Sequence, residues 1–305
     1  MRLTTTLLST LLLGSAISSA HAAFIGPAAD YNVFVWQDFT SSNTDAEGNV
    51  AAGGNINLQN YSVATQISGS AARLVAGGNV TATNGGVGNG QNGTIYVGGS
   101  TALTSFTARG GVLPQSLIDF SAASGLYQSL STSLGALAAN GSTNVNFGSL
   151  NLNGANAGLN VFTVNGNDLT NTNTVNISAL AGSTVLINVT GSGQTFQNGQ
   201  VFLTGVDAAH VIYNFSDASS LTLAGSKNPF GTIFAPFANV TGGFGALDGQ
   251  LVAESFNGNI EFHNVLFAGD LPAGVPVPAA IWLFASGLAV FGGMNRKKRQ
   301  TKAAC

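Results

Sequence analysis

Three acidic residues near the amino-terminal end have the types and spacing of a weak calcium site. Asp38, Asp45 and Glu47 lie close together in the sequence, and Asp30 precedes them. Carboxylates supply the hard oxygen ligands that Ca²⁺ prefers, and extracellular modules often bind this ion weakly. The sequence contains neither an EF-hand loop nor a Gly-Gly-x-Gly-x-Asp calcium repeat, so the alternative is a set of solvated turn residues before Gly48. The three acids are therefore calcium candidates, and we expect no other cofactor.

Catalytic chemistry has little support in the residue pattern. Polysaccharide lyases and hydrolases need paired acids, or an acid beside a cation, on one face, whereas the acids here are scattered and no Gly-x-Ser-x-Gly motif occurs. His210 and His263 lie in separate strand-like runs, which is typical of outward imidazoles. Gly88–Gly93 matches the dinucleotide fingerprint, but a strand-like run follows where a helix must begin. The sequence predicts a protein that is not an enzyme.

Charge is scarce and unevenly distributed. Of 305 residues, 7% are charged and 41 are glycines, against usual fractions of about 25% and about 7%. All twelve acids lie between Asp30 and Asp270, where the chain carries only three cations and a net charge of −9. Those cations are Arg73, Arg109 and Lys227. This balance excludes nucleic-acid or anionic-lipid binding through a basic face, and Cys305, the single cysteine, excludes an intrachain disulfide.

Residues 1–22 have the features of a secretory signal peptide. Arg2 precedes an apolar run over Leu7–Ile17, and Ala20 and Ala22 occupy the small-residue positions that signal peptidase favours. The alternative, an amino-terminal membrane anchor, requires a longer apolar stretch. We expect cleavage before Ala23 and export across the inner membrane.

The other end has the features of a membrane span. Val275 opens a Pro-rich linker, residues 279–294 carry no charge, and residues 296–299 are all basic. Twenty residues from Val275 would span about 30 Å as a helix, enough for a bilayer. The basic cluster is expected to stay cytoplasmic.

This carboxy-terminal segment resembles the PEP-CTERM sorting signal of Gram-negative bacteria. The residues that carry the resemblance are Val275, Pro276, Val277, Pro278, Ala279, Ala280, Trp282, Arg296, Lys297, Lys298 and Arg299. The resemblance implies that an exosortase-type membrane protease removes the tail, residues 272–305, and passes the body to the cell exterior. Val277 departs from the family's Pro-Glu-Pro, and a plain anchor without processing is the alternative.

Between the two ends the chain repeats a Gly-Gly phrase flanked by β-rich runs. Its copies are Val50–Leu58, Val75–Thr81 and Tyr96–Leu103, with first glycines at positions 53, 77 and 98. A second pair of similar phrases begins at Gly231 and Gly249. Periods of about 20 residues with short strands are typical of a solenoid. The sequence therefore predicts a mainly β domain over residues 23–271, folded as a parallel β-helix; the alternative is an antiparallel β-sandwich with Asn-Gly hairpins.

One segment, residues 114–139, has helical rather than strand periodicity. Its apolar residues recur at steps of three, four or seven: Leu117, Phe120, Tyr127, Leu130, Leu134 and Leu137. Pro114 suits a first helical turn, and Asn140-Gly141 suits a carboxy-terminal cap. Because an apolar stripe needs a partner, we expect this helix to lie along the side of the β-coil.

The body resembles a known family at its opening. Asp30–Phe39, Ser42–Val50 and the Ala-Ala-Gly-Gly-Asn phrase that follows are similar to the start of choice-of-anchor A domains of bacterial surface proteins. The resemblance extends over residues 30–268. It implies an exported adhesive module that is held by different anchors in different bacteria, PEP-CTERM tails among them.

A weaker likeness is to bacterial and fungal ice-binding β-helices, through the order of coil, helix and the phrases at Gly231–Pro236 and Gly249–Glu254. It implies a flat face rich in threonine. Thr101, Thr104 and Thr107 lie at steps of three, but no sustained Thr-x-Thr ladder is visible.

We interpret the chain as an exported cell-surface or extracellular-matrix adhesin. Its amides and hydroxyls can hydrogen-bond an exopolysaccharide, and Tyr61, Tyr96 and Phe106 are candidates for stacking on sugar rings. It would touch a membrane only through the tail, before processing. The alternatives are an ice-binding protein and a polysaccharide-cleaving enzyme.

Overall fold

The computed structural model describes residues 26–196, 199–223 and 225–272. The predicted signal peptide and its cleavage site, and the sorting tail from residue 273 onward, lie outside the described residues. Within the described part of the chain, no helix has the length and hydrophobicity needed to cross a membrane.

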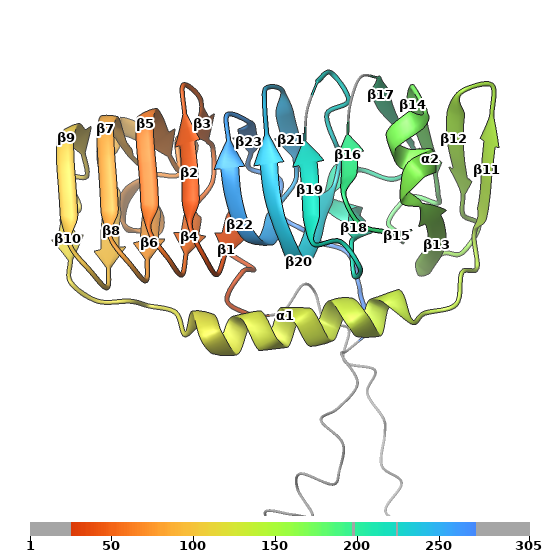
Figure 1. Cartoon of the computed structure of the whole chain (residues 1–305), viewed down its shortest axis with the longest axis horizontal. Coiled ribbons are helices and arrows are strands. Elements are labelled where there is room, and N and C mark those ends of the chain that lie inside the picture. Colours follow the sequence, from red (N-terminus) through yellow and green to blue (C-terminus); the bar gives the residue numbers. More distant parts are fainter. Residues whose placement is uncertain (1–25, 197–198, 224, 273–305) are drawn as a thin grey trace, which may run out of the picture.

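The described chain winds into a parallel β-helix, as the repeated phrase predicts (Figure 1). One side of the coil, the helix-covered face, is a continuous ladder of ten parallel strands. In spatial order they are β10 (Val112–Leu113), β8 (Thr94–Val97), β6 (Arg73–Ala76), β4 (Val50–Ala52), β1 (Val33–Val35), β22 (Leu251–Gly258), β20 (Thr232–Gly242), β18 (Val211–Asn214), β15 (Thr184–Thr190) and β13 (Leu159–Asn165).

A second side, the polar face, is also a parallel ladder. Its strands are β9 (Thr101–Thr107), β7 (Val80–Val87), β5 (Ile56–Val63), β2 (Phe39–Ser42), the second halves of β22 and β20, β19 (Ser220–Leu223) and β16 (Gln194–Phe196).

The third side holds the shortest strands. In the middle of the coil, the ends of β7 and β5 continue into β3 (Asp45–Ala46), β23 (Glu261–His263) and β21 (Ala246–Asp248). A separate sheet joins β17 (Gln200–Thr204), β14 (Thr174–Ser178), β12 (Ser149–Asn153) and β11 (Ser142–Asn146). Only β11 and β12, among the described pairs, run antiparallel. The β-sandwich alternative is therefore wrong.

The coils do not follow one another in chain order (Figure 1). The first coil, with β1, β2 and β3, lies in the middle of the molecule, and later coils stack outward to β9 and β10. Helix α1 (Phe120–Gly135) then runs along the coil to its other end, and the remaining coils stack back toward the middle. There the last coil pairs with the first at a closure seam, where β22 contacts β1 and β2, and β23 contacts β3.

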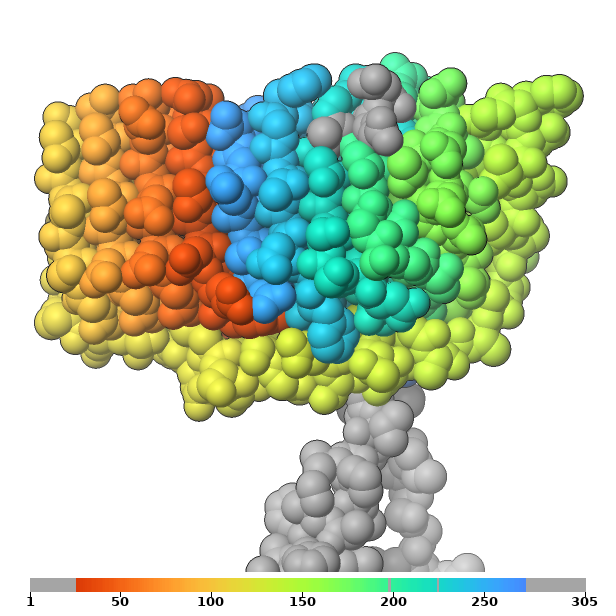
Figure 2. Space-filling model, in the orientation of Figure 1, coloured from red at the N-terminus to blue at the C-terminus, as the bar shows by residue number. Residues whose placement is uncertain are grey.

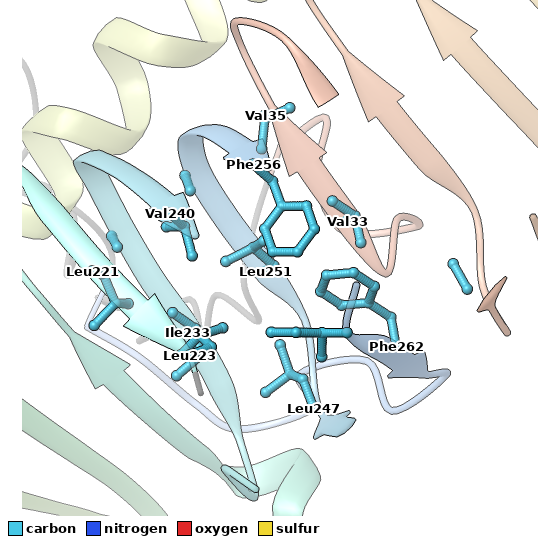
Figure 3. Close-up of a cluster of buried hydrophobic side chains, with 14 of the residues drawn as sticks. Val33, Val35, Leu221, Leu223, Ile233, Val240, Leu247, Leu251, Phe256 and Phe262 are labelled. Carbon is cyan, nitrogen blue, oxygen red and sulfur yellow. The ribbon is translucent and has the colours of Figure 1, made fainter. Parts of the chain in front are cut away.

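The interior of the coil is apolar and continuous through the seam. Phe39 of the first coil stacks on Phe256 of the last, with ring centroids 5.4 Å apart, and Phe262 meets Phe256 edge-on. Figure 3 shows these last-coil rings beside Val33 and Val35 of β1. Side chains of successive strand residues alternate between interior and exterior. Interior positions are therefore filled by Val, Leu, Ile and Phe from residues far apart in the chain.

Most strands of the helix-covered face are buried on both sides, because α1 and the segments beside it cover their exterior, whereas β10 is exposed. Phe34 points outward between two interior valines and packs on Phe120 and Tyr127 of the helix. The same second core contains outward residues of the returning coils, such as Ile212 and Phe234. Strands of a sheet that is covered on both faces have continuous apolar sequences, which explains runs such as Val-Phe-Val in β1.

Buried hydrogen bonds fix the position of α1 along the coil. The hydroxyl of Ser131 donates to Oδ1 of Asn214 at 2.5 Å, and Nδ2 of Asn214 donates to Oδ1 of Asn188 at 2.8 Å. Asn188 in turn donates to the carbonyl of Leu134 at 2.8 Å. At the other end, the Tyr127 hydroxyl accepts from the backbone N–H of Ala28 at 2.8 Å. Because polar groups left unpaired in a low-dielectric core are costly, these bonds favour one position of α1 over shifted positions.

The predicted helix is present and lies where we expect it, but both predicted boundaries are wrong. It begins at Phe120 rather than Pro114, because the Asp119 carboxylate caps it by accepting from the N–H of Ala122 at 3.0 Å. It ends at Gly135 rather than residue 139. Asn140 is not its cap; its Oδ1 accepts from the N–H of Val161 at 2.7 Å, which joins it to β13.

The Gly-Gly phrase marks a corner where stacked coils leave no room for a side chain. A Cβ atom on Gly77 would lie 2.3 Å from the carbonyl oxygen of Gly53, and one on Gly98 would lie 2.3 Å from that of Gly77. Glycine is required here by the close approach of one backbone to the next, which repeats at all three Gly-Gly phrases.

We expect Gly77→Ala to lower the free energy of unfolding by about 1–3 kcal/mol or more, because the neighbouring backbone must move. Gly243→Ala is the matched control, since nothing lies within 4 Å of its added Cβ; its effect should stay within about 0.5 kcal/mol. Urea unfolding measures both. Equal effects would contradict this account of the corner.

A single buried lysine closes the short helix α2 (Gly166–Asn171). Lys227 is 1% exposed, and its Nζ donates to the carbonyls of Leu169, at 2.9 Å, and Thr172. These carbonyls lie at the end of α2, where a cation complements the helix dipole. Burial lowers the pKa of Lys227 below its ordinary value.

This pKa shift predicts a pH dependence. At pH values between the lowered pKa of Lys227 in the folded protein and its ordinary value of 10.5, the unfolded chain binds more protons than the folded one. The contribution of Lys227 to the free energy of unfolding therefore rises with pH in this range. Lys227→Met should remove that contribution, so the free energy of unfolding of the wild type minus that of the variant should rise as pH approaches 10.5. Urea unfolding between pH 8 and 10.5 measures it, with exposed Arg109→Met as control. A constant difference would contradict the prediction.

Candidate functional site

The polar face presents one continuous row of small side chains, all but one of which are polar. Strand register aligns its central outward positions across eight strands. From one end to the other these are Ala102, Thr81, Asn57, Thr40, Asn257, Thr241, Thr222 and Thr195. We call this set the central row. Because neighbouring strands lie about 4.7–4.9 Å apart, the row offers a hydroxyl or amide at almost every step.

The central row contains no charged residue and rests on a rigid base. Its members alternate with buried interior residues, such as Leu221 and Leu223 around Thr222. The hydroxyls of Thr222 and Thr241 lie 3.2 Å apart, within hydrogen-bond distance. Figure 2 shows the strands of this face as a broad, even surface. Such a surface suits a partner that is itself extended and regular.

An asparagine ladder borders the central row on the side of the Gly-Gly corner. Oδ1 of Asn55 accepts from the N–H of Asn79 at 3.0 Å, and Oδ1 of Asn79 accepts from the N–H of Ser100 at 2.8 Å. Asp38 occupies the equivalent place in the first coil, where its Oδ1 accepts from the N–H of Asn55 at 2.7 Å. The third residue of the Gly-Gly-Asn phrase thus connects each coil to the next.

A second ladder borders the row on the opposite side. Nδ2 of Asn84 donates to Oδ1 of Asn60 at 3.0 Å, and Nδ2 of Asn60 donates to Oδ1 of Asn43 at 2.9 Å. All three residues have positive φ, between 50° and 59°, a conformation that asparagine tolerates better than most residues. Next to Asn43, the Ser42 hydroxyl donates to Oδ1 of Asn259 at 3.0 Å across the seam. From β2 to β9 on one side and from β2 to β7 on the other, the edges of the polar face are therefore fixed by side-chain bonds.

Sequence reasoning missed the central row because its threonines come from different coils. Thr101 and Thr104, which are close in sequence, occupy different positions: Thr101 lies opposite interior Val80, and Thr104 lies opposite Thr83, outside the central row. The only signal in the sequence is one threonine at the same place in several coils. Reading it requires knowing which coils are neighbours.

The candidates for sugar stacking are corrected by the structure. Tyr61 and Phe106 are 1% and 7% exposed and belong to the interior, where Tyr61 packs edge-on against Phe39. Tyr96 packs against the core beneath α1. None of these three aromatic rings lies on the polar face, because their strand positions point inward or toward the helix.

The three calcium candidates have separate local partners. Asp38 belongs to the asparagine ladder, Asp45 accepts from the Thr65 hydroxyl at 2.8 Å, and Glu47 accepts from the N–H of Asn264 at 2.9 Å. Among the described residues, the one group of three potential metal ligands with all atoms within 4.8 Å contains Glu47 but neither aspartate. The structure does not bring the three together as one calcium site.

The remaining charged candidates also have local partners. Arg73 forms an ion pair with Asp30 at 3.0 Å and donates to the Tyr31 hydroxyl at 3.0 Å, while Arg109 donates to a backbone carbonyl. His210 and His263 each contact their own carboxylate, Asp207 at 2.6 Å and Asp248 at 2.8 Å. Of the body's cations, none lies on the central row.

The glycine string at Gly88–Gly93 forms a short turn between β7 and β8. A strand follows it, as the sequence predicts, and not the helix that a dinucleotide site requires.

The fold and the polar face together define a parallel β-helix with one regular, polar, uncharged row of side chains. Residues 24–264 match the family model described as "Putative Ice-binding-like adhesive domain". The chain belongs to this family. A comparison with curated proteins found no match.

Solved structures with a similar arrangement include two ice-binding proteins. One, from an Antarctic Biological Consortium, is 13% identical, with a TM-score of 0.36, and the alignment covers 86% of this chain and 93% of that one. The other, from the Antarctic ascomycete Antarctomyces psychrotrophicus, is also 13% identical with a TM-score of 0.36, and the alignment covers 80% of this chain and 97% of that one.

Proposed function

We propose that this protein is an exported bacterial adhesin that binds an extended polysaccharide of a cell surface or extracellular matrix along its polar face. The observation that carries the proposal is the central row. Threonine hydroxyls and asparagine amides both donate and accept hydrogen bonds, as sugar hydroxyls require. Membership of an ice-binding-like adhesive family supports an adhesive role.

The rigidity of the face makes many weak contacts add up. Each hydroxyl or amide contributes little by itself because water competes for it. Once a polymer has made one contact with the central row, its further contacts form within the same complex, at a high effective concentration. This raises the overall affinity. The two asparagine ladders hold the surface in shape before binding, so little ordering cost remains. The mechanism is binding without cleavage, and the central row contains no acid for catalysis.

Ice is the second candidate partner, favoured by one specific observation. Five of the eight central-row residues are threonines at regular strand spacing on an even surface. A threonine presents a methyl group and a hydroxyl together, which suits a surface of ordered water. The family description supports the same partner.

The proposal includes export and sorting. Signal peptidase would cleave after Ala22, and the family match from residue 24 supports a body that begins there. An exosortase-type protease would remove the PEP-CTERM-like tail from a body resembling choice-of-anchor A domains, and so deliver the adhesin to the surface of a Gram-negative cell. The support for this step is the pattern from Val275 to Arg299.

The central row is tested by placing a bulky ring on it. Thr81→Tyr and Thr241→Tyr should each weaken binding to a polysaccharide array at least tenfold, about 1.4 kcal/mol, because the ring holds an extended polymer away from neighbouring steps. Thr143→Tyr, on exposed β11 of the separate sheet, is the matched control and should bind normally. No reducing ends should appear.

Ice binding is measured on the same variants through thermal hysteresis. If the wild type shows thermal hysteresis but binds no polysaccharide, and Thr241→Tyr abolishes the hysteresis, ice is the partner of the central row. Binding to either partner that survives both central-row changes but not Thr143→Tyr would contradict the proposed site.

Sorting is tested by the mass of the extracellular protein. In cells with an exosortase, the product should begin at Ala23 and lack the basic end at 296–299; in cells without one, that end should remain. A tail kept in both strains, with the protein held in the inner membrane, would identify a plain anchor instead.

A further inference from the structure

Four ionisable side chains meet outside the polar face, on the third side at the closure seam. Glu47 follows β3 in the first coil, Glu261 and His263 flank Phe262 on β23 in the last coil, and Asp248 ends β21 beside it. Register explains the gathering: Phe262 pairs with Ala46, and Asp248 with His263. Because Ala46 and Phe262 point inward, their neighbours point outward together.

The geometry of this seam cluster is that of a metal site. One ligand atom each from Glu47, Glu261 and His263 lies within 4.8 Å of the others. Nε2 of His263 lies 3.5 Å from Oε1 of Glu261, close to the edge, about 3.4 Å, of a tetrahedron with ligand bonds of about 2.1 Å. The N–H of Asn264 holds the Glu47 carboxylate at 2.9 Å.

Asp248 defines which imidazole nitrogen is available. Its Oδ1 lies 2.8 Å from Nδ1 of His263. When the carboxylate accepts a hydrogen bond from Nδ1–H, the lone pair of Nε2 is free to bind a metal ion. Metal-bound histidines usually have such a partner on their other nitrogen. Nε2 is the nitrogen that faces Glu261.

The carboxylates give the cluster a negative charge that favours binding of a cation. Three carboxylates surround one imidazole, and the body's three cations are engaged elsewhere: Arg73 with Asp30, Arg109 with Gly90, and Lys227 with carbonyls at α2.

We propose that Glu47, Glu261 and His263 bind a divalent transition-metal ion of the zinc class, with Asp248 orienting the imidazole. A nitrogen ligand favours such an ion over Ca²⁺, which prefers oxygen. The ion would join the first coil to the last, so its effect would be to lock the seam. This inference is independent of the proposed ligand of the polar face.

The test uses the full chain without a polyhistidine tag, freed of metal with EDTA and titrated with ZnCl₂ at pH 7.5. Calorimetry should show one site that requires His263, and the melting temperature should rise by several degrees. CaCl₂ should leave the melting temperature unchanged. Asp248→Asn should weaken Zn²⁺ binding about 10–100-fold.

Two variants and one control separate this site from background binding. His263→Ala and Glu47→Gln should abolish the zinc-dependent shift, with circular dichroism confirming that both fold. His210→Ala, which removes the other described histidine–carboxylate pair, should keep the full shift. Zinc binding that survives His263→Ala, no binding at all, or stabilisation by Ca²⁺ alone would overturn the proposal.

Discussion

Strand pairing between the first and the last coil holds this β-helix together. A coil can bury its apolar side chains only against its neighbours, and β1 would otherwise be an open edge in the middle of the molecule. Val33 pairs with Leu251, and Phe39 with Phe256, so that the interior passes through the seam without a break. The chain must therefore bring residues more than 200 positions apart into one ladder.

The path of α1 follows from this arrangement. Because the first coils stack outward to one end and the later coils return from the other, a connection must run the length of the coil (Figure 1). A helix with an apolar stripe does this while packing on outward residues of the middle strands, such as Phe34 and Phe234, and the buried Ser131–Asn214–Asn188 bonds fix its place. One side of the coil is thus occupied by α1, which leaves the polar face and the third side open to solvent.

Several local features were predictable from the sequence. The Gly-Gly phrase indicates the coil because the backbones of stacked coils approach closely at this corner, and only glycine fits there. The stripe from Phe120 to Leu134 predicts a helix, although its true start depends on Asp119 as a cap, which outcompetes Pro114. The interior position of Tyr61 was not predictable, because an aromatic residue in a Gly- and Asn-rich stretch gives no local sign of the side to which it points.

The period of the coil, the turns between its strands and the existence of one long helix can be predicted from the sequence, since each depends on residues close together in the chain. Which coils are neighbours becomes visible only in the folded molecule. That arrangement places Thr40 beside Asn257 and Asn257 beside Thr241, and it gathers Glu47 with Glu261 and His263. The physical reason is that parallel pairing joins coils through backbone hydrogen bonds, which carry no residue-specific signal over such separations.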